Sequence, residues 1–255
     1  MRNLKLVFSK KKYILIACVL IVVVFILGYF IVSDLRQQKI LRQEFNNLIN
    51  SDLLSDKIIV EIKTKGNYSD VENKIKNYFK KISDNYNVIS NYLLDENLIN
   101  ILSAKNIEED APKFEKSYKI LKDTKENIDE AIKNINYLCD RNTVENLIDK
   151  EKERGAIYKI YKESILTDKQ LNIFSNIKNE GQILSNKLIG FIDRVDVIIK
   201  LLEDDADYWY IDDEHLYFDS NKLLKKYNEL TDELNNFVEK EFNDYVSKSI
   251  KYDEE

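Results

Sequence analysis

The sequence is poor in residues that shape tight turns and in residues that often carry chemistry. Its 255 residues include 5 Gly, 1 Pro, 2 Cys and 1 His. So few Gly and Pro exclude collagen-like, linker-rich and turn-dense β architectures. A single His excludes catalysis or zinc ligation by several imidazoles. The formal net charge of -6 argues against a nucleic-acid partner, because such proteins need a basic face that displaces counterions.

Short catalytic and cofactor-binding motifs are also missing. The sequence has no Walker loop, G-x-S-x-G, H-E-x-x-H, C-x-x-C or dinucleotide-binding fingerprint. We therefore expect no catalytic residue, no cofactor and no resident metal, and a protein that is not an enzyme. Apolar residues, by contrast, make up 44% of the chain, which is too many for a disordered protein.

One long uncharged run near the N-terminus has the length of a membrane span. Residues 13–32 carry no charge, and ~20 helical residues cross the hydrocarbon core of a bilayer. The tail 1–12 contains basic residues and no acid, and such an excess belongs on the cytoplasmic side. We expect a single-pass protein of the cell membrane with a cytoplasmic N-terminus, a lipid-embedded helix over 13–32 and an extracytoplasmic C-terminus.

Two other interpretations of this run compete with an uncleaved anchor. A cleaved signal peptide would have a shorter apolar run and small residues near its end, whereas bulky Phe30, Ile31 and Val32 stand there. A lipoprotein signal would make Cys18 the modified residue, but further apolar residues follow it. The second cysteine, Cys139, continues a helical apolar pattern and is expected to be a small buried residue.

Beyond the run, helical apolar periodicity dominates the chain. We expect a stalk or first helix over 33–56, a helical bundle over 57–250 and a frayed tail over 251–255. Four long amphipathic patterns can hide their apolar stripes only against one another, which predicts a mainly all-α fold, an antiparallel bundle. The β-branched run 57–63 is interpreted as a strand or an extended connection.

Local signals indicate where some helices begin and where they approach one another. Ser69 to Glu72 and Thr167 to Gln170 have the form of capping boxes. Pro112 is expected to open a helix, since its missing N–H costs nothing in a first turn. Gly181 and Gly190 lie inside the longest helical pattern, where they predict either a bend or a close approach of a neighbouring helix.

The one clear non-helical part of the bundle is an acidic and aromatic segment at 203–218. Two β-forming runs flank Asp212–His215, which predicts a small β-hairpin near residues 208–218. Alternation along the first strand places Trp209 and Ile211 on one face and Tyr208 and Tyr210 on the other. The residues expected to form a contact surface are Tyr208, Trp209, Tyr210, Asp212, Asp213 and His215.

These features predict a non-enzymatic, membrane-anchored extracytoplasmic helical module that contacts a protein or an envelope component. The alternative is a module that binds a small ligand or a divalent metal through segment 203–218, because carboxylates are the ligands that Ca²⁺ prefers. The glycine of an EF-hand loop is absent from that segment, however. A third hypothesis is a hydrolase in which His215 acts as a general base beside carboxylates.

Three stretches of the sequence are familiar when taken together. They are Thr64–Glu72, Trp209–Phe218 and Tyr227–Leu230, in a chain rich in Lys, Ile and Asn. In these stretches the sequence resembles uncharacterised single-pass membrane proteins of Gram-positive, clostridial-type bacteria with a helical extracytoplasmic domain. The resemblance implies the same topology, and it implies no activity and no catalytic residue.

Overall fold

The computed structural model describes residues 2–50, 58, 60–150, 153 and 155–252, with side chains for 20–50, 58, 60–150, 153 and 155–242. The fold is mainly α-helical with one small hairpin, as the sequence predicted. The helices are α1 (Arg2–Asn50), α2 (Asn67–Asn91), α3 (Glu96–Ile99), α4 (Ala104–Asp110), α5 (Glu115–Leu138), α6 (Arg141–Glu145), α7 (Gly155–Ser164), α8 (Asp168–Asp204) and α9 (Asn221–Tyr252). Two 3₁₀ turns, η1 (Tyr92–Leu94) and η2 (Ala206–Tyr208), and two strands, β1 (Trp209–Asp212) and β2 (His215–Phe218), complete the described elements.

The chain divides into two compact units. Unit 1 comprises Met1–Lys80 and Glu145–Gln170, and unit 2 comprises Lys81–Val144 and Leu171–Glu255. Two segments distant in sequence therefore build each unit.

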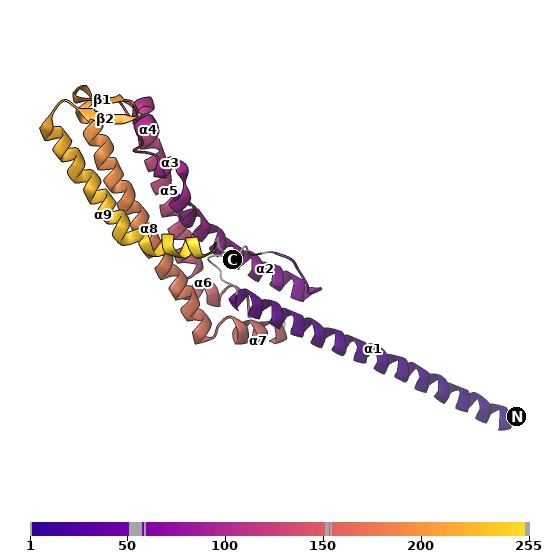
Figure 1. The fold of residues 1–255 in the computed structure, drawn as a ribbon. Coiled ribbons are helices and arrows are strands. Elements are labelled where there is room, and N and C mark those ends of the chain that lie inside the picture. The colour runs from indigo at the N-terminus through magenta and orange to yellow at the C-terminus, as the bar shows by residue number, and fades with distance from the viewer. Residues whose placement is uncertain (1, 51–57, 59, 151–152, 154, 253–255) are drawn as a thin grey trace. The chain divides into compact units, whose positions relative to one another are not determined.

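Unit 1 is built on α1, whose two described parts differ in burial. Over 20–32 the large apolar side chains are exposed, and these residues begin the helical segment Leu20–Asn50, which is long and apolar enough to cross a membrane. Further along, Leu41, Phe45 and Leu48 are buried, and α1 lies beside α7 (Figure 1). The side chain of Cys18 and residues 51–56 and 253–255 lie outside the described residues.

The start of α2 differs from the sequence prediction. α2 begins at Asn67, and the Ser69 hydroxyl donates to the Gly66 carbonyl at 2.6 Å. The Glu72 carboxylate accepts from the Thr64 amide at 2.8 Å and from the Lys63 amide. The capping box predicted at Ser69–Glu72 is therefore wrong, because a tertiary contact uses the carboxylate. The run before α2 is an extended connection at its described residues 58 and 60–63, with no strand among them.

The start of α5 also lies later than the proline predicts. α5 begins at Glu115, and Pro112 lies in the preceding turn, so the prediction that Pro112 opens the helix is wrong. The Asp110 carboxylate instead accepts from the amides of Lys116 at 3.0 Å and Ser117 at 2.7 Å. Partial burial acts to raise the pKa of Asp110, but the hydrogen bonds from Ser117 and Lys116 outweigh it and lower that pKa.

The start of α8 follows the prediction in part. The Gln170 backbone N–H donates to the Thr167 hydroxyl at 3.4 Å, which is the first half of a capping box. Among the described residues the buried Gln170 side-chain oxygen has no hydrogen-bond partner. The hydroxyl of Thr167 therefore caps α8 by itself.

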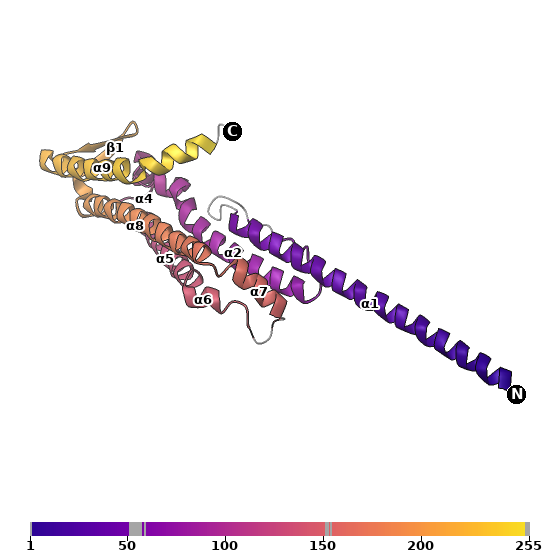
Figure 2. The same cartoon turned by 90° about the horizontal axis from the view of Figure 1, so that it is seen from below.

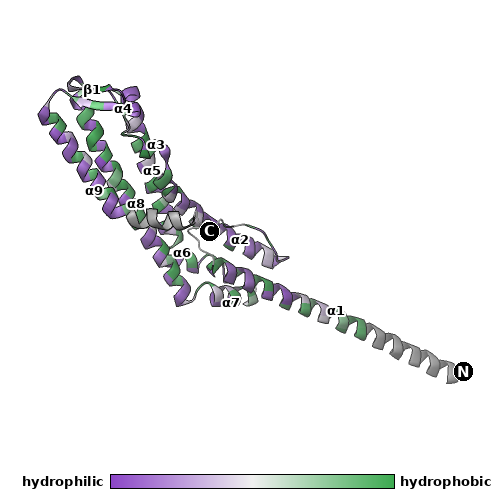
Figure 3. Ribbon diagram, in the orientation of Figure 1, coloured by the Kyte–Doolittle hydropathy of each residue, from purple (hydrophilic) through white to green (hydrophobic). Residues whose placement is uncertain are grey.

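In unit 2, α5 and α9 pack against α8. Hydrophobic and hydrophilic residues alternate along α8, as expected for an amphipathic helix (Figure 3). A methyl group at Gly181 would lie 3.3 Å from the Ile132 side chain of α5. A methyl group at Gly190 would lie 2.9 Å from the Phe237 ring of α9. Of the two alternatives that the sequence left open, a bend or a close approach, these distances show a close approach at both glycines.

The hairpin joins α8 to α9 and matches its predicted position. β1 and β2 are antiparallel, with Tyr210 opposite Tyr217 and Asp212 opposite His215. The two turn residues Asp213 and Glu214 both have left-handed backbones, with φ of 47° and 61°, which is typical of a type I′ turn. Within unit 2 the strands lie close to the beginning of α9, and α4 lies at the same end of the unit (Figures 1 and 2).

Candidate functional site

The inner face of the hairpin is fixed to unit 2. The Trp209 indole donates to the Leu202 carbonyl at 2.8 Å and lies against Phe114, with ring centroids 6.3 Å apart. On the other strand Phe218 packs against Tyr227 of α9, with centroids 5.0 Å apart. Alternate residues of both strands are half-buried in this way, so the hairpin is held in one orientation by its packed side.

The outer face of the hairpin is covered with tyrosines. On that face Tyr210 and Tyr217 have 51% and 44% of their surface exposed, and Tyr208, in η2 directly before β1, has 56% exposed; we call these three residues the tyrosine face. The Tyr210 and Tyr217 rings face each other across the two strands, with centroids 5.4 Å apart and planes inclined by 16°. Exposed aromatic groups on a fixed framework are typical of binding surfaces, since little side-chain freedom is lost on binding.

Carboxylates surround this face. Asp212, Asp213 and Glu214, here called the acidic turn, are all exposed. The exposed His215 ring lies beside them, with Nδ1 2.6 Å from the Asp213 carbonyl oxygen. That contact is to the backbone, so it orients the imidazole without aligning it on a nucleophile.

Glu203, at the end of α8, has a structural role. Its carboxylate accepts from the Tyr118 hydroxyl at 2.7 Å. Burial, then this hydrogen bond to an anion, raises the pKa of Tyr118 well above its ordinary value. Glu203 therefore joins α8 to α5 and is engaged within the bundle.

The structure brings most of the expected contact residues to one end of unit 2, but on two faces. Tyr210 is on the outer face and Asp212, Asp213 and His215 are at the turn, whereas Trp209 is on the inner face. Tyr208 is exposed in η2, directly before β1. Sequence reasoning omitted Tyr217 from the contact surface. The strand pairing supplies the missing signal, because a partner directly opposite Tyr210 shares its face.

A second polar group lies buried in unit 1, where Glu44, Lys63, Glu72 and Lys76 form what we call the lysine cluster. The Lys76 ammonium is 2.6 Å from Glu44 and 2.6 Å from Glu72, and it also donates to the Glu61 carbonyl. The side chains of Lys76 and Glu72 are 4% and 0% exposed. Lys63 closes the cluster from the more exposed side, 2.9 Å from Glu44.

The electrostatics of the lysine cluster are those of a satisfied buried network. Burial acts to raise the pKa of Glu72, but hydrogen bonds from Lys76 and Thr64 outweigh it and lower that pKa. The pKa of Glu44 is lowered in the same way, against burial, by Lys76 and Lys63. Each charge has opposite-charge partners, so the cluster fastens the extended connection to α1 and α2 and offers no free group for chemistry.

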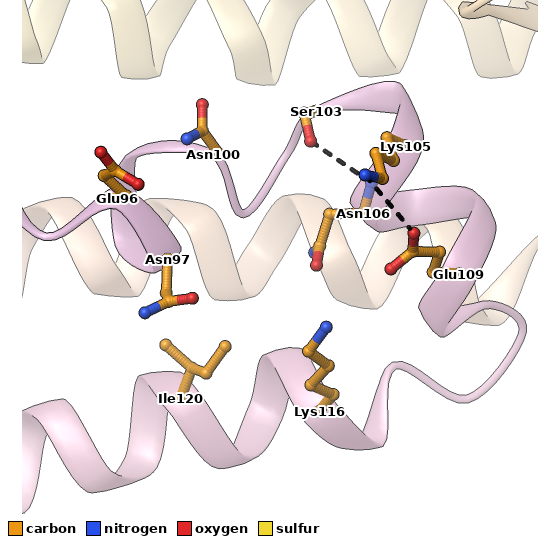
Figure 4. Close-up of a pocket in the computed structure, with 9 residues that line it drawn as sticks. All are labelled: Glu96, Asn97, Asn100, Ser103, Lys105, Asn106, Glu109, Lys116 and Ile120. Atoms are coloured by element: carbon orange, nitrogen blue, oxygen red, sulfur yellow. Dashed lines mark hydrogen bonds and ion pairs between the residues drawn. The ribbon is translucent and has the colours of Figure 1, made fainter.

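The structure also has a shallow polar depression between α3, α4 and α5 (Figure 4). Its volume is about 210 Å³, and it is open to solvent. The Asn106 backbone N–H donates to the Ser103 hydroxyl at 3.3 Å, and the Lys105 ammonium lies 4.0 Å from Glu109. Ligand pockets are usually deeper and mostly apolar, so this depression is a weak candidate.

The described residues give little support to a metal-binding site or to a reactive cysteine. Among residues whose side chains the structure describes, no group of three or more His, Cys, Asp or Glu side chains could hold a metal ion. Cys139 is buried, and this burial raises the pKa of its thiol to about 12. The hairpin is thus the strongest candidate site.

No protein-family model, curated protein or solved structure matches the chain.

Proposed function

We propose that this protein is a membrane-anchored, non-enzymatic module that uses the outer face of its hairpin to contact a protein or envelope component. One observation carries the proposal: two tyrosines are exposed on a hairpin, and a third directly before it, while the opposite face of the hairpin is fixed to unit 2. Exposed aromatic side chains on a fixed framework are typical of interaction sites.

The anchor in this proposal is the apolar part of α1. Its exposed large side chains over 20–32 have no favourable place in water, and a bilayer would cover them. The basic tail 1–12 would lie in the cytoplasm of a Gram-positive cell, and residues 33–255 would lie outside.

The topology can be tested with a C-terminal epitope tag on the full chain in wall-stripped cells. Protease added outside should remove the tag, while a cytoplasmic control protein stays intact. Protection of the tag until the cells are lysed would contradict the proposed orientation.

The contact surface can be tested by placing a photo-crosslinking amino acid at position 217 in cells. Position 137 is a matched control, since Tyr137 is another tyrosine of unit 2 and is 67% exposed on α5. We expect a discrete crosslinked product from position 217 and none from position 137. Equal products from both positions, or none from position 217, would contradict the proposed role of the hairpin.

A small-ligand module is the second candidate, favoured by the stacked pair Tyr210 and Tyr217. Flat exposed rings can stack on the apolar face of a sugar. Calorimetry of the full chain with a set of envelope glycans would test it, and saturable heat that Tyr217→Ala abolishes would support it. The same titration with Ca²⁺ tests the divalent-metal form of this candidate.

A further inference from the structure

The negative charge of this protein is concentrated at the hairpin. Residues 203–219 hold eight Asp and Glu and no Lys or Arg. The whole chain has a formal net charge of -6, so removing the -8 of this segment leaves +2 for all other residues together. Seventeen residues therefore account for the acidity of the whole protein.

These carboxylates are not neutralised inside the molecule. Within the described residues, no ion pair joins any acid of 203–219 to a Lys or Arg, and only Glu203 has a side-chain partner. The acidic turn and Asp207, Asp204 and Asp219 are exposed. Unpaired like charges at close range repel one another, and a cationic partner would remove that repulsion.

The tyrosine face adds a second and different attraction for cations. The ring faces of exposed tyrosines attract an ammonium or, more often, a guanidinium group. Tyr210 and Tyr217 form a stacked platform near the acidic turn. Ile211 alone separates Tyr210 from the turn on the first strand, and Leu216 and His215 separate Tyr217 from it on the second. A positive side chain over this platform would meet both the rings and the carboxylates.

We infer that the hairpin recognises arginine- or lysine-rich polypeptide segments, with cationic side chains over the tyrosine face and the acidic turn neutralising their charge. The inference rests on the proposed function, and it gives that contact surface a partner of defined chemistry. Charge complementarity selects a basic polypeptide over an acidic envelope polymer, which this end of unit 2 would repel.

The test uses the full chain in nanodiscs of neutral lipid and a fluorescein-labelled dodecapeptide of alternating arginine and glycine, followed by fluorescence anisotropy. The same peptide with glutamate in place of arginine is the probe control. We expect binding of the arginine peptide at 20 mM salt, none of the glutamate peptide, and about tenfold weaker binding at 150 mM salt because screening shortens the range of the attraction.

Variants separate recognition by the hairpin from general attraction to an acidic protein. Tyr210→Ala and Tyr217→Ala leave the charge unchanged, and each should weaken binding about fivefold, while Tyr217→Phe should keep it within about twofold. Tyr137→Ala on α5 is the matched control and should have no effect. If both hairpin alanine variants bind like the wild type, the tyrosine face plays no part and the inference is wrong.

Charge variants complete the test. Neutralising the acidic turn with Asp212→Asn, Asp213→Asn and Glu214→Gln should weaken binding at least tenfold. A matched triple variant removes the same charge from exposed positions on α5 and α8, by Asp129→Asn, Glu130→Gln and Glu180→Gln. Equal losses in the two triple variants would show attraction to net charge alone and would overturn the inference.

The crosslink at position 217 distinguishes failure of this inference from failure of the proposed function. If the crosslink in cells persists in the triple variant that neutralises the acidic turn, the hairpin contacts a partner but not through its charge. In that case the inference alone fails. Selective peptide binding without any crosslink in cells supports the recognition chemistry, and the proposed function alone fails.

Discussion

Removal of the buried ammonium of Lys76 is the sharpest test of how unit 1 is held together. We consider Lys76→Met, which keeps the length and apolar stem of the side chain and removes its charge. The wild-type ammonium contacts Glu44, Glu72 and the Glu61 carbonyl while almost entirely shielded from water. In the variant, both carboxylates stay buried with one cation fewer.

The expected loss follows from the charge balance of the lysine cluster. Two glutamates and two lysines carry no net formal charge, and the substitution leaves one negative charge uncompensated. Removing one partner of a buried ion pair costs about 3–5 kcal/mol. Glu72 keeps its hydrogen bonds from the Thr64 hydroxyl at 2.6 Å and amide at 2.8 Å, so we expect the lower end, about 3 kcal/mol.

Urea denaturation of the full chain in nonionic detergent, followed by circular dichroism, would measure this loss. With a slope of about 2 kcal/mol per molar urea for a unit of this size, the midpoint should fall by about 1.5 M. Lys74→Met is the matched control, because Lys74 is exposed on the same helix. A Lys76→Met midpoint within about 0.3 M of the Lys74→Met midpoint would refute the reasoning.

The pH dependence of the unfolding free energy, measured for the wild type and for Lys76→Met, checks the sign of the effect. The folded-state pKa values of Glu44 and Glu72 lie below the ordinary 4.5, so their stabilisation is present above that value and is lost as pH falls through the lowered pKa values. In Lys76→Met, acid removes the uncompensated charge. The difference in unfolding free energy between wild type and variant should therefore shrink below about pH 4.5.

Three further predictions concern unit 2. Gly190→Ala should lower the free energy of unfolding by about 1–3 kcal/mol in the same denaturation assay, because its new methyl group would lie 2.9 Å from the Phe237 ring. The Arg194 guanidinium covers that ring, 4.0 Å from its centroid. Gly155→Ala is the control and should cause no such loss, because nothing lies within 4 Å of its new methyl group. Glu214→Gly should stabilise by about 1 kcal/mol, since φ is 61° there, and Glu214→Ala should give no such gain. In a Cys18→Ser background, Cys139 should resist maleimide at pH 7.5 until urea unfolds the chain, because burial raises its pKa to about 12.

The sequence predicted features that depend on local order and missed those that depend on tertiary contacts. The hairpin was found because alternation and a short polar turn are visible in a few consecutive residues. The capping role given to Glu72 was wrong because the structure directs that carboxylate to amides eight and nine residues earlier in the chain. No local pattern distinguishes these two uses of a glutamate.

The start of α5 shows the same division. Pro112 correctly predicted that a helix begins nearby, but α5 begins three residues later, at Glu115. The Asp110 carboxylate caps the backbone amides six and seven residues after it. For the candidate site, alternation separated Trp209 from Tyr210. Only the strand register adds Tyr217 to the tyrosine face.

The rest of unit 1 contacts α1 directly after the apolar run, and this contact limits how the unit can move relative to the helix. The helix continues unbroken past Val32, and the Tyr68 hydroxyl already reaches Asp34 at 2.9 Å. Two residues of helix rise only about 3 Å. If Val32 marks the edge of the hydrocarbon, the packing of α1 against the rest of unit 1 begins at the lipid headgroups without a flexible tether. A thinner bilayer that tilts the helix would then incline unit 1 by the same angle.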